Sequence, residues 1–348
     1  MRYNLLGQTG LFVSELCMGT MTFGTNPGPY AEAGGVLQNE ADAIVKAAFD
    51  AGVNFIDTAN VYGNGGGSEE ITGQALKNLG IARNDVVLAT KVEGTMGPGP
   101  NDGGASRYHI MNQVKDSLRR LGTDHVDLYQ IHGFDPATPV EETMRALDDL
   151  VTQGHVRYIG ISNWAAWQIA DANGIADRLG LTRLQSVQSY YSLAGRELER
   201  EIIPLVVAKQ IGLMIYSPLA GGYLSGKYRA SDAGRRKTVS FPPLDETRGG
   251  QVLTAVDAIA ERHDVPLAAV ALAWLLQQRA VTSVIIGAKR VEQLKENLAS
   301  VQVQLTEQDL CELEAASAIA PEYPGWMVHV HGVPRRQLWQ NASTQKQN

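Results

Sequence analysis

Apolar residues recur along this chain in short runs that alternate with longer, amphipathic stretches. The apolar runs predict eight strands, at residues 15–20, 53–57, 86–91, 126–132, 156–161, 184–188, 213–216 and 283–287. Most runs show no alternation of apolar and polar positions, which is typical of strands buried on both faces. The amphipathic stretches predict helices at residues 40–51, 68–79, 107–121, 140–153, 164–179 and 198–209. Eight strands followed by helices favour an α/β protein with a closed (β/α)8 TIM barrel over an open sheet.

Several segments are additions to this barrel. Residues 2–16 predict a β-hairpin, which is expected to plug the N-terminal end of the barrel. Long loops are predicted at residues 93–106 and 219–250. Two further helices are predicted at residues 265–278 and 306–318. The C-terminal tail is irregular, and from residue 335 it is polar and expected to be disordered. No linker divides the chain, so a single domain is predicted over residues 1–348.

Four polar residues stand at or just after the ends of predicted strands. Asp57, Lys91 and His132 end the second, third and fourth strands, and Tyr62 lies in the turn after Asp57. In a parallel barrel these strand ends converge on the face where active sites are built. A carboxylate, a phenol, an ammonium and an imidazole brought together there can transfer protons, which indicates an enzyme.

Composition excludes several classes of protein. A net charge of −7 and a pI near 5.6 argue against a nucleic-acid partner, which requires a basic face. The two cysteines, Cys17 and Cys311, form no metal-ligand spacing and suit a reducing compartment. The chain starts without the pattern of a signal peptide and contains no run long enough to span a membrane. We therefore expect a soluble, cytoplasmic protein without a membrane partner.

A glycine-rich turn follows the second predicted strand, with glycines at positions 63, 65, 66 and 67. It lacks the G-x-G-x-x-G spacing and does not follow the first strand, so it is not a Rossmann fingerprint. We interpret it as a flexible turn that leads to a helix N-cap at Ser68.

Six ordered motifs resemble those of the aldo-keto reductases. They read GVNFIDTANVYG, LATK, HVDLYQIHGFD, GHVRYIGISN, IYSPLAGGYLSGKY and IIGAKRVEQLKENL. The similarity runs from about residue 3 to about residue 318. The resemblance implies a barrel that binds an extended nicotinamide dinucleotide without a Rossmann domain.

The resemblance also implies roles for the four polar residues. Reduction of a carbonyl needs a proton delivered to oxygen, and a phenol is a poor acid because its pKa is about 10. The Lys91 ammonium is expected to lower the pKa of Tyr62, and Asp57 to neutralise and orient Lys91. Tyr62 is then the general acid in reduction and the base in oxidation, while His132 orients the substrate oxygen.

Later motifs imply the cofactor contacts. Ser162, Asn163 and Gln188 match residues that bind the nicotinamide carboxamide, and Tyr216 matches the aromatic residue on which the nicotinamide ring stacks. Small residues and a lysine are predicted near the pyrophosphate: Ser217, Pro218, Leu219, Gly221 and Lys227.

The last strand leads to the expected adenosine end of the cofactor. Gly287, Lys289 and Arg290 precede a helix N-terminus, which favours the extra phosphate of NADP(H). Gln293 and Asn297 match contacts to the adenosine. Many relatives carry an arginine in place of Gln293, so NADH stays open as an alternative.

Substrate contacts are expected in loops at the same face. The predicted residues are Met21, Phe23, Val61, Trp164 and Tyr191, with Asn60, the loop at 94–105 and Trp326 as further candidates.

Together these patterns predict an NADP(H)-dependent oxidoreductase that reduces aldehydes or ketones reversibly to alcohols. One alternative is a Schiff-base lyase with Lys91 as nucleophile. Another is an NADPH-binding regulatory protein, as the β-subunits of potassium channels are. A metal hydrolase is disfavoured because no His-x-His pattern occurs at the strand ends, so no metal is expected. The natural substrate, the reaction direction and the oligomeric state stay open.

Overall fold

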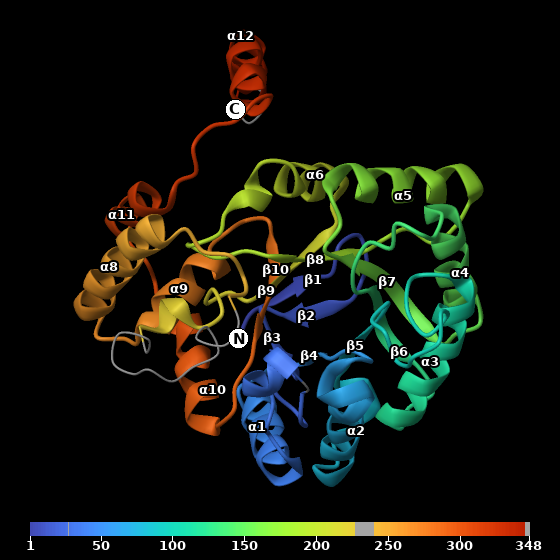
Figure 1. Ribbon diagram of the computed structural model, residues 1–348. Coiled ribbons are helices and arrows are strands. Elements are labelled where there is room, and N and C mark those ends of the chain that lie inside the picture. Colours follow the sequence, from blue (N-terminus) through green and yellow to red (C-terminus); the bar gives the residue numbers. More distant parts are fainter. Residues whose placement is uncertain (27, 227–239, 345–348) are drawn as a thin grey trace.

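The computed structural model describes residues 1–26, 28–226 and 240–344. Eight parallel strands close into a barrel, with helices around its outside (Figure 1). The strands are β3 (Leu16–Gly19), β4 (Phe55–Asp57), β5 (Val87–Val92), β6 (Val126–Ile131), β7 (Val156–Ser162), β8 (Ser186–Tyr190), β9 (Gly212–Tyr216) and β10 (Val281–Ile286). They follow one another in chain order, and β10 pairs with β3 to close the ring. The predicted barrel is confirmed.

The helices of the barrel cover the outer face of the strands. They are α1 (Gln38–Asp50), α2 (Tyr62–Asn78), α3 (Arg107–Leu121), α4 (Val140–Thr152), α5 (Ala166–Leu179), α6 (Ile202–Lys209), α8 (Glu246–His263), α9 (Leu267–Leu276), α10 (Val291–Leu298) and α11 (Glu307–Ser317). In α4 the buried residues Met144, Leu147 and Leu150 recur three apart on the side that packs against β7. Helix α3 begins at the Ser106 cap and ends at Gly122, whose φ is 65°.

The N-terminal hairpin closes one end of the barrel. Its strands β1 (Tyr3–Leu5) and β2 (Phe12–Ser14) pair antiparallel, as predicted. Leu6 and Val13 are fully buried in one cluster with Phe55, Leu128 and Met214, whose side chains fill the barrel interior. The strand ends on the opposite side are therefore the ones left open for a site.

Three predicted segments differ in the structure. Helix α8 begins inside the predicted loop 219–250, because the Asp245 carboxylate caps it by accepting from the amides of Thr247 and Arg248. The helix predicted at residues 198–209 starts only at Ile202, since Pro204 is tolerated in a first turn but not in a helix interior. A helix, α12 (Gly325–Thr344), replaces the expected irregular tail and stands away from the barrel (Figure 1).

Candidate active site

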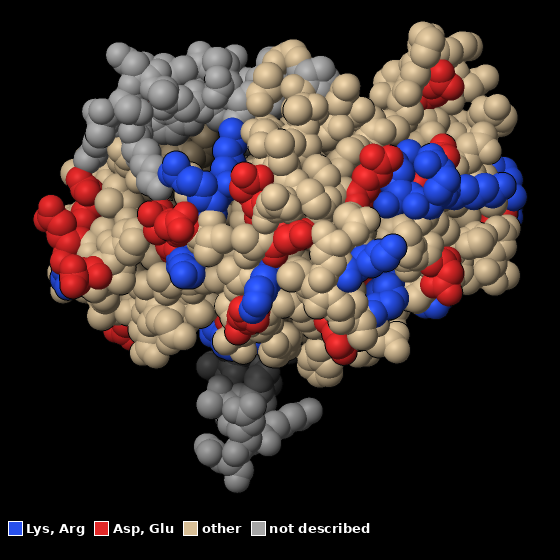
Figure 2. Space-filling model, turned by 90° about the horizontal axis from the view of Figure 1, so that it is seen from below, with Lys and Arg blue, Asp and Glu red and all other residues tan. Residues whose placement is uncertain are grey.

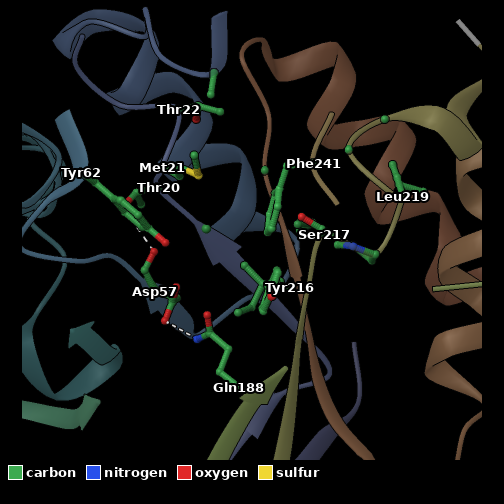
Figure 3. A pocket seen from close by; sticks show the side chains of 18 of the residues that line it. Thr20, Met21, Thr22, Asp57, Tyr62, Gln188, Tyr216, Ser217, Leu219 and Phe241 are labelled. Atoms are coloured by element: carbon green, nitrogen blue, oxygen red, sulfur yellow. Dashed lines mark hydrogen bonds between the residues drawn. The ribbon is translucent and has the colours of Figure 1, made fainter. Parts of the chain in front are cut away.

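A cavity of about 890 Å³ opens at the C-terminal ends of the strands. Its wall includes Thr20 and Met21 after β3, Asp57 of β4, Gln188 of β8, Tyr216 of β9 and Gly287 after β10. Figure 3 shows Tyr62, Asp57, Gln188 and Tyr216 directed from different elements into this common space.

The four residues predicted to act together lie together. The Lys91 ammonium donates to Asp57 Oδ2 at 2.5 Å and to the Thr58 carbonyl at 2.9 Å. Lys91 Nζ lies 5.0 Å from the centroid of the Tyr62 ring, and Tyr62 Oη lies 3.5 Å from Nε2 of His132. Asp57, Tyr62 and His132 line the cavity, whereas Lys91 is fully buried beneath it.

Burial and pairing set the charges in this cluster. Burial by itself lowers the pKa of Lys91, but the charges of Asp57 and Tyr62 outweigh it and raise the pKa above its usual value. Burial, followed by the positive charge of Lys91, lowers the pKa of His132 to about 3. At neutral pH the site therefore holds an ammonium and a neutral imidazole.

The glycine-rich turn places Tyr62 at the edge of the cavity. Gly63 to Gly66 all have positive φ, and a Cβ on Gly63 would lie 2.4 Å from the backbone nitrogen of Ser68. The prediction that Ser68 caps the following helix is wrong. Its hydroxyl donates instead to the Thr20 carbonyl at 2.7 Å and lies 3.1 Å from Oγ1 of Thr58, so it ties α2 to the ends of β3 and β4.

Most residues predicted to bind the cofactor border the cavity. These are Ser162, Asn163, Gln188, Tyr216, Ser217, Pro218, Leu219, Gly221, Gly287, Lys289 and Asn297. Arg290 and Gln293 do not border it: Arg290 is exposed at the start of α10, and the Gln293 side chain accepts from the backbone amide of Lys289 at 2.9 Å. Lys227 lies outside the described residues.

One polar atom in the cavity wall has no hydrogen-bond partner among the described residues. It is the buried hydroxyl of Ser162. Its neighbour Asn163 donates to the His132 carbonyl at 2.9 Å and accepts from the Tyr216 hydroxyl at 2.8 Å. Burial, then the nearby Tyr62 and Tyr190, raises the pKa of Tyr216 to about 12, so this hydroxyl stays a donor. A buried polar atom without a partner fits a site for the amide group of a nicotinamide.

Of the five predicted substrate contacts, two border the cavity and three do not. Met21 and Val61 are in the wall. Phe23 is fully buried in the outer core layer, and Trp164 packs edge-on against Phe134 away from the cavity. Tyr191 is also turned into the core, where its hydroxyl donates to Glu199 at 2.5 Å and its ring contacts Trp274. The further candidates Asn60, the loop at 94–105 and Trp326 do not line the cavity either.

Sequence reasoning missed several residues of the site, among them Phe241 and Gln130. The ring of Phe241 lines the cavity and lies nearly parallel to that of Tyr216, with 6.4 Å between the centroids. It was missed because it lies inside the long loop predicted at residues 219–250. Gln130 of β6 donates to Asp57 Oδ1 at 3.0 Å. Its signal is a polar residue two positions after the inward-facing Leu128, which places it on the same face of β6.

Other kinds of site find little support in the described residues. Within residues 1–26, 28–226 and 240–344 no three His, Cys, Asp or Glu side chains are grouped to hold a metal ion. No described helix combines the length and apolar character needed to cross a bilayer. Figure 2 shows that basic side chains on the face seen from below lie interspersed with acidic ones.

A barrel with these side chains at its strand ends fits an oxidoreductase, and comparison with known proteins gives the family. Residues 15–318 match the model of the aldo/keto reductase family, and the chain belongs to this family.

Similar proteins cover nearly the whole chain. A probable voltage-gated potassium channel subunit beta from Arabidopsis thaliana is 41% identical over 313 residues, 87% of this chain and 92% of that protein. An uncharacterized oxidoreductase, YrpG, from Bacillus subtilis is 40% identical over 89% of this chain and 94% of its own length. The versiconal hemiacetal acetate reductase of Aspergillus parasiticus is 35% identical over 93% of this chain and 99% of its own length.

Proposed function

We propose that this protein is an NADP(H)-dependent reductase of aldehydes or ketones that also runs in reverse on alcohols. The observation that carries the proposal is the buried Lys91–Asp57 ion pair beneath Tyr62, with the neutral His132 ring 3.5 Å from the phenol oxygen. When bound, a nicotinamide dinucleotide supplies or accepts the hydride.

Each of the four residues has one task in this proposal. Tyr62 donates its phenolic proton to the carbonyl oxygen in reduction and takes a proton from the alcohol in oxidation. The Lys91 ammonium stabilises the phenolate that results, and Asp57 holds Lys91 in place at 2.5 Å. His132 forms a hydrogen bond to the substrate oxygen and so fixes its position.

The cavity offers two ends for the cofactor. Ser162, Asn163 and Gln188 would hold the nicotinamide carboxamide near Tyr62. Lys289 in the cavity wall and its neighbour Arg290 at the N-terminus of α10 would hold the 2′-phosphate, since cationic side chains and the positive end of a helix both favour an anion there. This second end supports NADP(H) over NAD(H).

Steady-state assays with Tyr62→Phe test the function. The purified protein is mixed with NADPH and a diverse panel of carbonyl compounds, and loss of reduced-cofactor absorbance is followed. We expect turnover by the wild type and a loss of at least about a thousandfold in Tyr62→Phe, with NADPH affinity changed less than a few fold. Unchanged activity in the variant would show that another group is the acid.

The Arabidopsis relative favours a second candidate, an NADPH-binding regulatory subunit. Such a protein binds the cofactor but turns it over negligibly. The same assay distinguishes the reductase from the regulatory subunit, because tight NADPH binding without multiple turnovers on any substrate would support the regulatory role.

The geometry speaks against a Schiff-base lyase. Lys91 is fully buried, does not line the cavity, and its ammonium is held by Asp57 and the Thr58 carbonyl. A nucleophilic lysine must be reachable and deprotonated, whereas the pKa of Lys91 is raised.

A further inference from the structure

Gln130 links two residues of the site although it does not itself line the cavity. It is fully buried on β6 and donates through Nε2 to Asp57 Oδ1 at 3.0 Å. Its Oε1 accepts from Nε2 of Gln188 at 3.2 Å. Gln188 Nε2 also donates to Asp57 Oδ1, at 2.9 Å. The three side chains therefore form a closed triangle of hydrogen bonds beneath the cavity.

The chemistry of Asp57 fixes the direction of every bond in this triangle. Asp57 forms an ion pair with the Lys91 ammonium, so it is a carboxylate and can only accept. Both amides must then turn their NH₂ groups toward it. The NH₂ of Gln130 faces Asp57, which leaves the Gln130 oxygen to accept the second N–H of Gln188.

One acceptor of Gln188 is left for the cavity. Both of its N–H groups are directed at Asp57 and Gln130, and Figure 3 shows its nitrogen turned to Asp57 and its oxygen turned away. No described residue donates to this oxygen, and Gln188 is part of the cavity wall. The Ser162 hydroxyl, also without a partner among the described residues, borders the same space and can donate.

We propose that Gln130 is a positioning residue that fixes the amide of Gln188 with its oxygen toward the cavity, so that the site selects a primary carboxamide over the same ligand without an N–H donor. The inference rests on the proposed function, in which the ligand is a nicotinamide dinucleotide. A carboxamide offers an NH₂ for the Gln188 oxygen and a carbonyl for the Ser162 hydroxyl. A methyl ketone offers only the carbonyl and leaves the Gln188 oxygen desolvated and unpaired.

Calorimetric titration with two ligands tests this. The probes are NADP⁺ and its analogue in which a methyl ketone replaces the carboxamide on the pyridine ring. We expect wild type to bind the analogue on the order of tenfold or more weakly, because a buried acceptor loses its donor. A wild-type ratio near one would overturn the proposal without any variant being made.

The variants Gln130→Met and Gln130→Glu then separate positioning from simple structural support. Gln130→Met removes the acceptor that holds the second N–H of Gln188, so we expect the affinity ratio to fall at least threefold toward one. Damage to the fold weakens both ligands alike and leaves the ratio unchanged, which would count against the role proposed for Gln130. Gln130→Glu keeps an oxygen for Gln188 and, while protonated, a donor for Asp57, so the ratio should return at low pH and fall as the pH rises.

The outcomes also separate this inference from the function on which it rests. If wild type binds NADP⁺ and reduces carbonyl compounds but the ratio is the same in Gln130→Met, only the role of Gln130 is wrong. If wild type binds neither dinucleotide, the proposed cofactor fails and the inference fails with it.

Discussion

At the scale of single residues, the site keeps a neutral imidazole beside a permanent positive charge. Burial and the Lys91 ammonium both oppose protonation of His132 and lower its pKa to about 3. A neutral ring can donate one hydrogen bond to a carbonyl oxygen without giving up its proton. In the proposed reaction this leaves the proton transfer to Tyr62 and the orientation of the substrate to His132.

The ring signals of His132 should therefore keep their neutral positions between pH 8 and pH 5. In the unfolded chain the pKa is about 6.5. Because the folded pKa is lower, the contribution of this group to stability is present above pH 6.5 and is lost as the pH falls toward 3. NMR of histidine-labelled protein measures the titration, and His132→Gln assigns the signal. A midpoint near 6 would contradict the predicted environment.

Arg290 provides a second test at this scale. It is the exposed N-cap residue of α10, where its charge adds to the positive end of the helix. We expect Arg290→Ala to weaken NADPH by about tenfold and NADH by less than twofold, since only NADPH carries the 2′-phosphate. The matched control is Lys295→Ala, an exposed cation farther along the same helix, which should change neither affinity. Equal losses for the two cofactors would rule out the 2′-phosphate contact.

At the scale of elements, the turn between β4 and α2 sets the position of Tyr62. Four consecutive residues, Gly63 to Gly66, have positive φ, so the chain reverses tightly before the regular part of α2 begins. Ser68 then fastens the first regular turn of α2 to Thr20. The phenol is consequently held by backbone geometry on one side and by a buried hydroxyl cluster on the other.

Two alanine variants in this turn should differ sharply. Gly63→Ala puts a Cβ 2.4 Å from the Ser68 nitrogen at φ 68°, so backbone must move and Tyr62 with it. We expect a loss of about 2–4 kcal/mol in the free energy of unfolding and at least tenfold in kcat. Gly65→Ala has φ 86° but meets no atom within 4 Å, so it should cost only about 1–2 kcal/mol and little activity. Urea unfolding and the carbonyl assay measure both; similar losses in the two variants would refute this role of the turn.

The order of the strands and helices could be predicted from the sequence, because strands buried on both faces leave continuous apolar runs. The ends of each observed strand lie within two residues of those predicted. Asp57, Lys91 and His132 were found for the same reason, as polar residues that end such runs. Boundaries in loops were less predictable: Gly249 suggests a loop, yet it lies inside α8, buried against Leu244.

Side-chain direction was the part that the pattern could not supply. Trp164 and Tyr191 are close in sequence to residues that border the cavity, but their own backbone turns them into the outer core. Gln130 is buried within β6, and its partner Asp57 lies 73 positions away in the chain. Contacts of this kind depend on how the barrel closes, and no local pattern in one sequence predicts that closure.

At the scale of the whole molecule, the two ends of the barrel have opposite tasks. The hairpin fills the N-terminal end with Leu6 and Val13, so the interior is packed and dry there. The other end carries Lys91, Asp57 and the cavity above them. The loops at the open end can therefore vary with the substrate while the hairpin end stays packed.

The C-terminal part of the chain divides into an attached helix and a separate one. Helix α11 is fastened by Arg196, a buried residue that donates to Glu314 and to the Ser317 hydroxyl, each at 2.7 Å. Helix α12 stands off the barrel, Trp326 is 45% exposed, and the family match ends at residue 318. The barrel and its cavity are therefore complete without α12.

Two truncations test that division. A chain ending at Ala318 should keep its Tm within about 3 °C and its kcat within about twofold, because none of the described residues beyond Asn297 lines the cavity. A chain ending at Leu305 removes α11, whose Leu313 is fully buried in the core, and leaves Arg196 with Glu199 but without Glu314, so it should lose about 3–5 kcal/mol of stability. Calorimetry and the carbonyl assay on both chains measure this. Loss of activity in the chain ending at Ala318 would mean that α12 acts on the site after all, and the prediction would then be wrong.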